Sequence, residues 1–67
     1  MFDKGYNDGV AAYNNDLRKG RMARENSEIR TRALDSTNNL PNLKWLSDQE
    51  VSAYFIGFVM GYTSRSG

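Results

Sequence analysis

The chain has 67 residues, a formal net charge of +1 at pH 7, and neither cysteine nor histidine. These absences exclude disulfide bonds, a histidine or thiolate metal site, and the usual general base and thiol nucleophile of enzymes. A core of this size supplies only roughly 3–5 kcal/mol. We therefore expect one small domain over residues 1–67 that is not an enzyme, binds no metal or cofactor, and depends for stability on close helix packing, self-association or a partner.

The first helix is expected to begin near Asp3, whose carboxylate suits the positive end of the helix dipole. Large apolar residues recur at steps of three or four, the period of a helix: Phe2, Tyr6, Val10, Tyr13 and Leu17. Beside them runs a stripe of small residues: Gly5, Gly9 and Ala12. Because glycine costs a helix about 1 kcal/mol relative to alanine, these two glycines predict either a close packing contact or a loop.

The next segment is basic. It has six cationic residues, Arg18, Lys19, Arg21, Arg24, Arg30 and Arg32, against Glu25 and Glu28, which leaves a local charge of +4. Gly20 follows two cations, as at the end of a helix. Opposite charges four residues apart, such as Arg21 and Glu25, instead favour continuation. We predict a helix over about 3–34 that is either continuous or broken at Gly20.

Residues 35–42 form the clearest break in the pattern, since they are rich in turn-forming residues and include the only proline, Pro41. An apolar cluster overlaps and follows this break: Leu40, Leu43, Trp45 and Leu46. We expect Trp45 and at least two of these leucines to cover the open side of a helix pair.

The second helix has the clearest start in the chain, because Ser47-Asp48-Gln49-Glu50 has the spacing of a capping box. A helix is predicted over 48–64, with a broad apolar face and a small-residue stripe of Ala53, Gly57 and Gly61. Its most apolar stretch, 51–62, is shorter than the roughly 20 residues that cross a bilayer. We expect no membrane segment.

One short pattern, aromatic-x-x-Gly-aromatic-x-x-Gly, occurs near both ends of the chain. Its residues are Phe2, Gly5, Tyr6 and Gly9, then Tyr54, Gly57, Phe58 and Gly61. Glycines at helical spacing let two helix axes approach more closely than the usual 8–10 Å. The predicted fold is an all-α antiparallel helical hairpin with Gly5, Gly9, Gly57 and Gly61 at the crossing and a linker that contains Pro41 and Trp45. The alternative is that the glycine stripes pack between two chains of a homodimer.

The basic segment is the main candidate binding site. Arg18, Lys19, Arg21, Arg24, Arg30 and Arg32 could neutralise several phosphates of a nucleic acid. The alternative is an ordinary charged helix face, which the interleaved glutamates favour. Most aromatic residues are expected in the core, whereas Tyr13, Tyr54 and Tyr62 are candidates for an interface, where tyrosine often keeps its hydroxyl in water.

The motif residues Gly5, Tyr6 and Gly9, followed by Tyr54, Gly57 and Phe58, make the chain resemble ribosome modulation factor, a family of very short helical proteins. The chain departs from that family in its linker, which lacks a Cys-Pro-Tyr-like element around Pro41, and in its basic residues, which follow the first motif. The resemblance implies binding to ribosomal RNA and reversible silencing of the ribosome, with the motif residues in a structural role.

The sequence favours a small cytoplasmic regulator without enzymatic activity, which binds RNA or a ribonucleoprotein such as the ribosome through its basic helix. The alternative is a protein-binding inhibitor or adaptor, of the type that phages and mobile elements encode, which occludes a host enzyme or subunit. In that case the basic helix meets an acidic protein surface, or Tyr13, Tyr54 and Tyr62 supply the main contacts.

Overall fold

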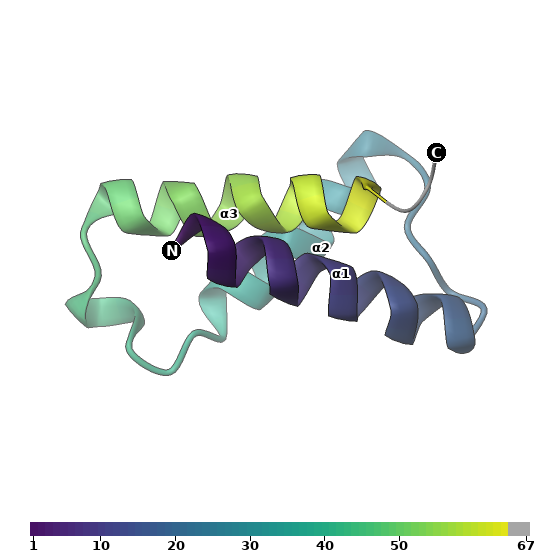
Figure 1. Ribbon diagram of the computed structural model, residues 1–67, viewed down its shortest axis with the longest axis horizontal. Helices are drawn as coiled ribbons and strands as arrows, with labels where there is room; N and C mark the ends of the chain where they lie inside the picture. The colour runs from purple at the N-terminus through teal and green to yellow at the C-terminus, as the bar shows by residue number, and fades with distance from the viewer. Residues whose placement is uncertain (65–67) are drawn as a thin grey trace.

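The computed structural model describes residues 1–64 and is all-α over that part of the chain, as predicted (Figure 1). Three helices, α1 (Phe2–Arg18), α2 (Asn26–Asn38) and α3 (Asp48–Thr63), form an elongated bundle of 34 × 19 × 19 Å. Residues 19–25 connect α1 to α2. The linker from α2 to α3 contains a short 3-10 helix, η1 (Leu43–Trp45).

Helices α1 and α3 lie side by side and run in the same direction (Figure 1). Gly5 of α1 lies against Tyr54 of α3, and Gly9, one turn later, lies against Phe58. The predicted antiparallel hairpin is therefore wrong. The physical reason is that the segment between the two glycine motifs forms a helix of its own, α2, which returns the chain to the end of the bundle at which α1 begins.

The break at Gly20 occurs, and the continuous helix over 3–34 does not. Gly20 has φ +69°, a left-handed conformation that glycine adopts without steric penalty. Its amide donates to the carbonyl of Leu17 at 3.0 Å, and the amide of Arg21 donates to the carbonyl of Asp16 at 2.8 Å. These two bonds form a Schellman motif, which satisfies the last free carbonyls of α1 and turns the chain away.

Helix α2 begins at Asn26. The signal for its start is formed by Glu25 and Glu28 and not by the residues around Gly20. The carboxylate of Glu28 accepts a hydrogen bond of 3.1 Å from the backbone amide of Glu25, as in a capping box. Arg21 and Arg24 precede this helix. A continuous helix would have placed them one turn from Glu25 and Glu28 as ion pairs, and no such pair is present within residues 1–64.

The contact between α1 and α3 is built on Gly5, Gly9, Gly57 and Gly61, all of which are buried. A Cβ on Gly5 would lie 2.9 Å from the carbonyl carbon of Tyr54, and a Cβ on Gly61 would lie 2.9 Å from that of Tyr6. These neighbours are backbone atoms, which cannot move aside as a flexible side chain can. Each helix therefore fits into the notch left by the other helix's glycines, and both stripes pack within one chain.

Helix α2 covers the α1–α3 pair and closes the hydrophobic core. The buried apolar residues are Ile29, Ala33, Leu40, Tyr54, Phe58 and Tyr62. The rings of Tyr54, Phe58 and Tyr62 follow one another along α3, with centroids 6.4 and 6.1 Å apart. Ala33 has no exposed surface, and its small side chain allows α2 to approach this row of rings.

The linker covers the core with its leucines but not with its tryptophan. Leu40 is buried, and Leu43 and Leu46 are half-buried against the core. Trp45 is 80% exposed, so its expected role as a cover is wrong. A 3-10 turn repeats every three residues, which places Leu43 and Leu46 on the same side of η1 and directs Trp45 elsewhere.

Helix α3 begins as predicted, and its range of Asp48–Thr63 differs from the expected 48–64 by one residue. The Ser47 hydroxyl accepts the amide hydrogen of Glu50 at 3.2 Å, and the Glu50 carboxylate accepts that of Ser47 at 3.1 Å. The hydrogen bond from the Ser47 backbone, together with that from its hydroxyl, lowers the pKa of Glu50.

Candidate functional site

Four exposed cationic residues are concentrated where α1 ends and the chain crosses to α2. They are Arg18, Lys19, Arg21 and Arg24, which we call the basic connection. None of them forms an ion pair within the part of the chain that the structure describes, where the two ion pairs are Lys4–Asp8 and Asp16–Arg32. The basic connection is therefore a local excess of positive charge.

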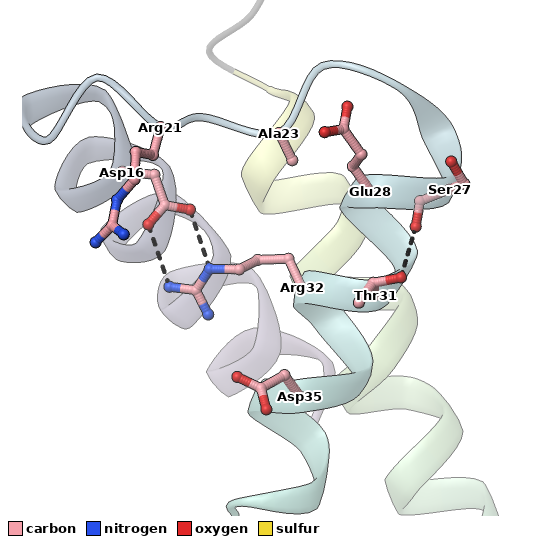
Figure 2. Close-up of a pocket in the computed structure, with 8 residues that line it drawn as sticks. All are labelled: Asp16, Arg21, Ala23, Ser27, Glu28, Thr31, Arg32 and Asp35. Atoms are coloured by element: carbon pink, nitrogen blue, oxygen red, sulfur yellow. Dashed lines mark hydrogen bonds and ion pairs between the residues drawn. The ribbon is translucent and has the colours of Figure 1, made fainter.

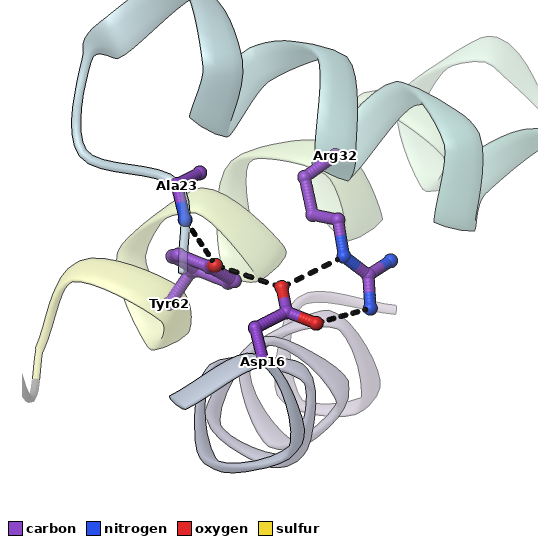
Figure 3. A network of polar contacts seen from close by, with 4 residues as sticks. All are labelled: Asp16, Ala23, Arg32 and Tyr62. Carbon is purple, nitrogen blue, oxygen red and sulfur yellow. Dashed lines mark hydrogen bonds and ion pairs between the residues drawn. The ribbon is translucent and has the colours of Figure 1, made fainter. Parts of the chain in front are cut away.

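The backbone of the basic connection is fixed at both ends. The Schellman motif holds its start, as described above, and the amide of Ala23 donates a hydrogen bond of 2.8 Å to the Tyr62 hydroxyl (Figure 3). Met22 and Ala23 are half-buried, while Arg21 and Arg24 on either side of them are exposed. The inward residues thus anchor the segment and leave the cations in solvent.

A polar network lies behind the basic connection, at the point where the three helices meet (Figure 3). Asp16 accepts hydrogen bonds from the Arg32 guanidinium, at 3.0 Å from Nε and 3.4 Å from Nη2, and from the Tyr62 hydroxyl at 2.8 Å. The Arg32 guanidinium carbon also lies 6.0 Å from the centroid of the Phe58 ring, which is within range of a cation–π interaction.

The ionisation of this network follows from its contacts. Burial of Asp16 opposes its charge, but the hydrogen bonds from Arg32 and Tyr62, the charge of Arg32 and the smaller effect of the Lys19 charge outweigh it and lower the pKa of Asp16. The hydrogen bond to Asp16 raises the pKa of Arg32 in turn. Burial and the neighbouring Asp16 carboxylate raise the pKa of Tyr62. At neutral pH the network therefore contains one carboxylate, one guanidinium and one neutral phenol.

The surface is hollowed beside this network, in a depression of about 440 Å³ (Figure 2). Its charged residues alternate in sign: Asp16, Arg21, Glu28, Arg32 and Asp35. A second hollow of about 420 Å³ shares several of these residues and adds Lys19. Because carboxylates and cations line the hollows together, neither concentrates positive charge, and the positive excess lies on the exposed basic connection.

Five of the six predicted basic residues are exposed, and the sixth, Arg32, is held in an ion pair. Arg18, Lys19, Arg21 and Arg24 lie together on the basic connection, and Arg30 is exposed on α2. Arg32 is different, because Asp16 occupies two of its nitrogens and its side chain is 32% exposed. Arg32 therefore joins α2 to α1, and its contact with a partner stays a prediction.

Two of the three predicted interface tyrosines are core residues. Tyr54 and Tyr62 are each 1% exposed, so the prediction that they contact a partner is wrong. Both hydroxyls are satisfied inside the protein, by Asp8 and Asp16 respectively. Tyr13 is half-buried and packs edge-on against Tyr62, with centroids 5.4 Å apart and an interplanar angle of 88°.

Asp8 and Asp16 were not singled out by the sequence analysis, although they anchor the tyrosines of α3. The available signal was their spacing: the two aspartates are eight residues apart in α1, and Tyr54 and Tyr62 are eight apart in α3. Equal spacing on two helices allows both pairs to form if the helices are parallel. This signal has meaning only once the orientation of the helices is known.

Comparison with known proteins identifies no relative: no family model, no curated protein and no solved structure matches the chain. Among residues 1–64, no three carboxylates lie close enough together to hold a metal ion. None of the three described helices combines the length and the hydropathy needed to cross a bilayer.

Proposed function

We propose that this chain is a small regulatory protein without enzymatic activity, which binds RNA or a ribonucleoprotein through the basic connection. The observation that carries this proposal is that Arg18, Lys19, Arg21 and Arg24 are exposed and without an ion-pair partner in residues 1–64. An unpaired cation can bind a phosphate and release the counterions of that phosphate, which favours binding at low salt.

The fixed backbone of the basic connection supports the same proposal. The bond from Ala23 to Tyr62 and the turn at Gly20 tie the main chain of the segment to α3 and to the end of α1 in the absence of a ligand. Binding then orders side chains but not the main chain, which reduces the entropic cost of association. Three of the four cations are arginines, whose planar groups donate two parallel hydrogen bonds to a phosphate.

Ribosomal RNA is the first ligand to test, because the glycine–aromatic motifs of the chain resemble those of ribosome modulation factor. Under this proposal the motif residues act only through packing. Gly5, Gly9, Gly57 and Gly61 lie against backbone atoms and have no side chain with which to contact RNA. The contacts with RNA then come from the basic connection.

The proposal is tested by titrating the protein with labelled single-stranded and ribosomal RNA fragments at several salt concentrations. The double variant Arg21→Gln/Arg24→Gln should bind more weakly at every salt concentration, and the slope of log K against log salt should fall by roughly 1.4, since each phosphate contact contributes about 0.7 for a single strand. Lys44→Gln is the matched control, because it removes an exposed cation from η1. Absence of binding at low salt, or an equal effect of Lys44→Gln, contradicts the proposal.

A protein-binding inhibitor or adaptor is the second candidate function, and Trp45 favours it. A tryptophan that is 80% exposed is unusual outside interfaces, and tryptophan is enriched among the residues that dominate protein–protein binding. A pull-down from nuclease-treated lysate separates the two candidates. Stoichiometric retention of one protein by the wild-type chain, lost with Trp45→Ala and kept with Arg21→Gln/Arg24→Gln, would favour this second function over RNA binding.

A further inference from the structure

Helix α3 has an outer face that no other element within residues 1–64 covers. The helix carries no charged residue from Val51 to Thr63. Its glycine side packs on α1 and its row of rings packs on α2, but Ile56 and Met60 are 53% and 49% exposed. A helix that is apolar on all sides is normally buried on all sides, so the outer face of α3 indicates a further contact.

A groove runs along this face between α3 and α2. It has a volume of about 360 Å³ and a mainly apolar lining: Leu34, Thr37, Val51, Ser52, Phe55 and Ile56. Leu34 is 53% exposed at its edge. Met60 extends the apolar surface by one turn beyond Ile56, since residues four apart lie on the same side of a helix. Contiguous apolar surface of this kind marks interaction sites.

The two ends of the face carry opposite charges. Asp48 lies one turn before Ser52 on the same side of α3, and it is exposed. Arg30 is also exposed, and it lies one turn before Leu34 in α2. Ile29, the residue before Arg30 in α2, lines a hollow with Tyr62 and Thr63 at the end of α3, so Arg30 lies toward the Met60 end of the face, far from Asp48. Along the outer face, an acidic end at Asp48 is therefore followed by the apolar groove and then by a basic end at Arg30.

We propose that this face binds a second copy of the same chain, with the two α3 helices antiparallel about a two-fold axis between Ser52 and Ile56. A two-fold interface uses the same patch on both molecules, so the patch must be complementary to itself after a half-turn. An apolar centre with a negative end and a positive end has this property. The rotation brings Asp48 of each molecule to Arg30 of the other.

Two further features fit a second copy. Ser52 is small and exposed, so two α3 helices can approach closely at that point. Antiparallel helices also place the positive end of each dipole beside the negative end of the other. The basic connection takes no part in this contact, so the dimer is independent of RNA binding.

The proposal is tested by analytical ultracentrifugation or light scattering over a concentration series. The wild-type chain should be a dimer that dissociates on dilution. Ile56→Glu places a charge in the centre of the face and should give a monomer with unchanged helical circular dichroism. Leu17→Glu is the matched control, because Leu17 is 48% exposed on α1 and outside the groove, and this variant should remain dimeric.

A charge exchange identifies the arrangement of the two copies. Asp48→Arg and Arg30→Asp should each weaken dimerisation by about tenfold, because each places like charges opposite one another at two symmetry-related positions. The double variant Asp48→Arg/Arg30→Asp should recover most of the wild-type affinity. If Ile56→Glu fails to fold, Ser52→Arg tests the same contact at an exposed position without removing an apolar side chain.

The possible contrary results are distinct. A monomeric wild-type chain over the whole concentration range overturns the proposal, whether or not another protein binds the groove. A dimer that persists in both Ile56→Glu and Ser52→Arg overturns it too, because the copies then meet through another surface. Failure of the double charge variant to recover affinity overturns the antiparallel arrangement.

Discussion

Tyr62 donates its hydroxyl proton to Asp16 over 2.8 Å, and Tyr54 forms the same bond with Asp8 over 2.6 Å, eight residues earlier in both helices. Each tyrosine oxygen also accepts one hydrogen bond, from a donor in the chain beyond α1. For Tyr62 the donor is the Ala23 amide at 2.8 Å, and for Tyr54 it is the Ser36 hydroxyl at 2.9 Å, since the tyrosine proton is already used. Two phenols thus join α3 to α1 and to the segments that follow it.

The first prediction concerns acid stability. The pKa of Asp16 is lowered in the folded protein, so Asp16 stabilises the fold above its usual pKa of 3.8, and this contribution is lost as the pH falls through the lowered value. Asp16→Asn should decrease the free energy of unfolding at neutral pH by about 1–2 kcal/mol, because it removes charge-assisted hydrogen bonds at a partly exposed site.

Urea unfolding from neutral to acidic pH checks this prediction. The difference between wild type and Asp16→Asn should shrink below about pH 4, where Asp16 of the unfolded chain binds its proton first, and should be lost once the pH is below the lowered pKa of the folded protein. Asp3→Asn is the control, because the exposed Asp3 carboxylate lies in the first turn of α1, at the far end of that helix from Asp16. An equal loss with Asp3→Asn would show that general charge, and not the network, is responsible.

The second prediction concerns alkaline pH. Burial first, and then a neighbouring aspartate, raise the pKa of both Tyr54 and Tyr62 above the usual value of 10.0. Their contribution to stability is fully present below pH 10 and is lost as the pH rises through the raised values, because an ionised phenol would face a carboxylate. Spectrophotometric titration should show late ionisation that coincides with unfolding. Tyr54→Phe and Tyr62→Phe should each remove part of this late phase. Late ionisation that is unchanged in both variants is the result that this account does not allow.

The glycine contact between the terminal helices could be expected from the sequence, whereas the direction of the helices could not. The spacing of Gly5, Gly9, Gly57 and Gly61 defines a notch on each helix, but a notch fits a partner of either direction. Direction is decided by the segment between the helices. A linker without a helix returns the chain once, whereas α2 returns it twice. The start of α2 depends on a glutamate at the capping position, which is a weaker signal than the serine that precedes α3.

The third prediction tests the glycine contact directly. Gly9→Ala would favour an isolated helix by about 1 kcal/mol. In this bundle the new Cβ would lie 2.8 Å from the amide nitrogen of Tyr62, so we expect a net loss of about 3 kcal/mol or failure to fold. Thermal unfolding followed by circular dichroism measures the effect. Asn14→Ala, at an exposed position of the same helix, should change stability by less than about 0.5 kcal/mol. Full stability of Gly9→Ala would mean that α1 and α3 are not this close.

The side chain of Trp45 was predicted to cover the core, and its exposure shows a limit of sequence reasoning. Hydrophobicity indicates which residues prefer burial, but a short 3-10 turn has room to bury only one side. Leu43 and Leu46 occupy that side in η1, and the larger tryptophan remains outside. The sequence shows that Leu43, Trp45 and Leu46 are clustered apolar residues. It does not show that a 3-10 turn directs the two leucines inward and the tryptophan outward.

The fourth prediction follows from this division. Trp45→Ala should change the free energy of unfolding by less than about 0.5 kcal/mol, because the indole is mostly exposed. Leu40→Ala removes a smaller side chain but one that is only 8% exposed, and it should cost about 2–3 kcal/mol. Chemical denaturation of both variants provides the comparison. A larger loss for Trp45→Ala than for Leu40→Ala would place the indole in the core after all.

The fifth prediction separates the structural arginine from the arginines of the basic connection. Arg32 is held by Asp16, so Arg32→Gln should lower stability by about 1–2 kcal/mol and leave the salt dependence of RNA binding unchanged. Arg21 is exposed and has no ion-pair partner in the described residues, so Arg21→Gln should do the reverse. It should reduce the slope of log K against log salt by roughly 0.7 and change stability by less than about 0.5 kcal/mol. Both variants are measured by thermal unfolding and by RNA titration on the same preparations. If Arg32→Gln and Arg21→Gln change stability and the salt dependence of RNA binding to the same extent, the two arginines have the same role. The distinction between Arg32 as a structural residue and Arg21 as an RNA contact is then wrong.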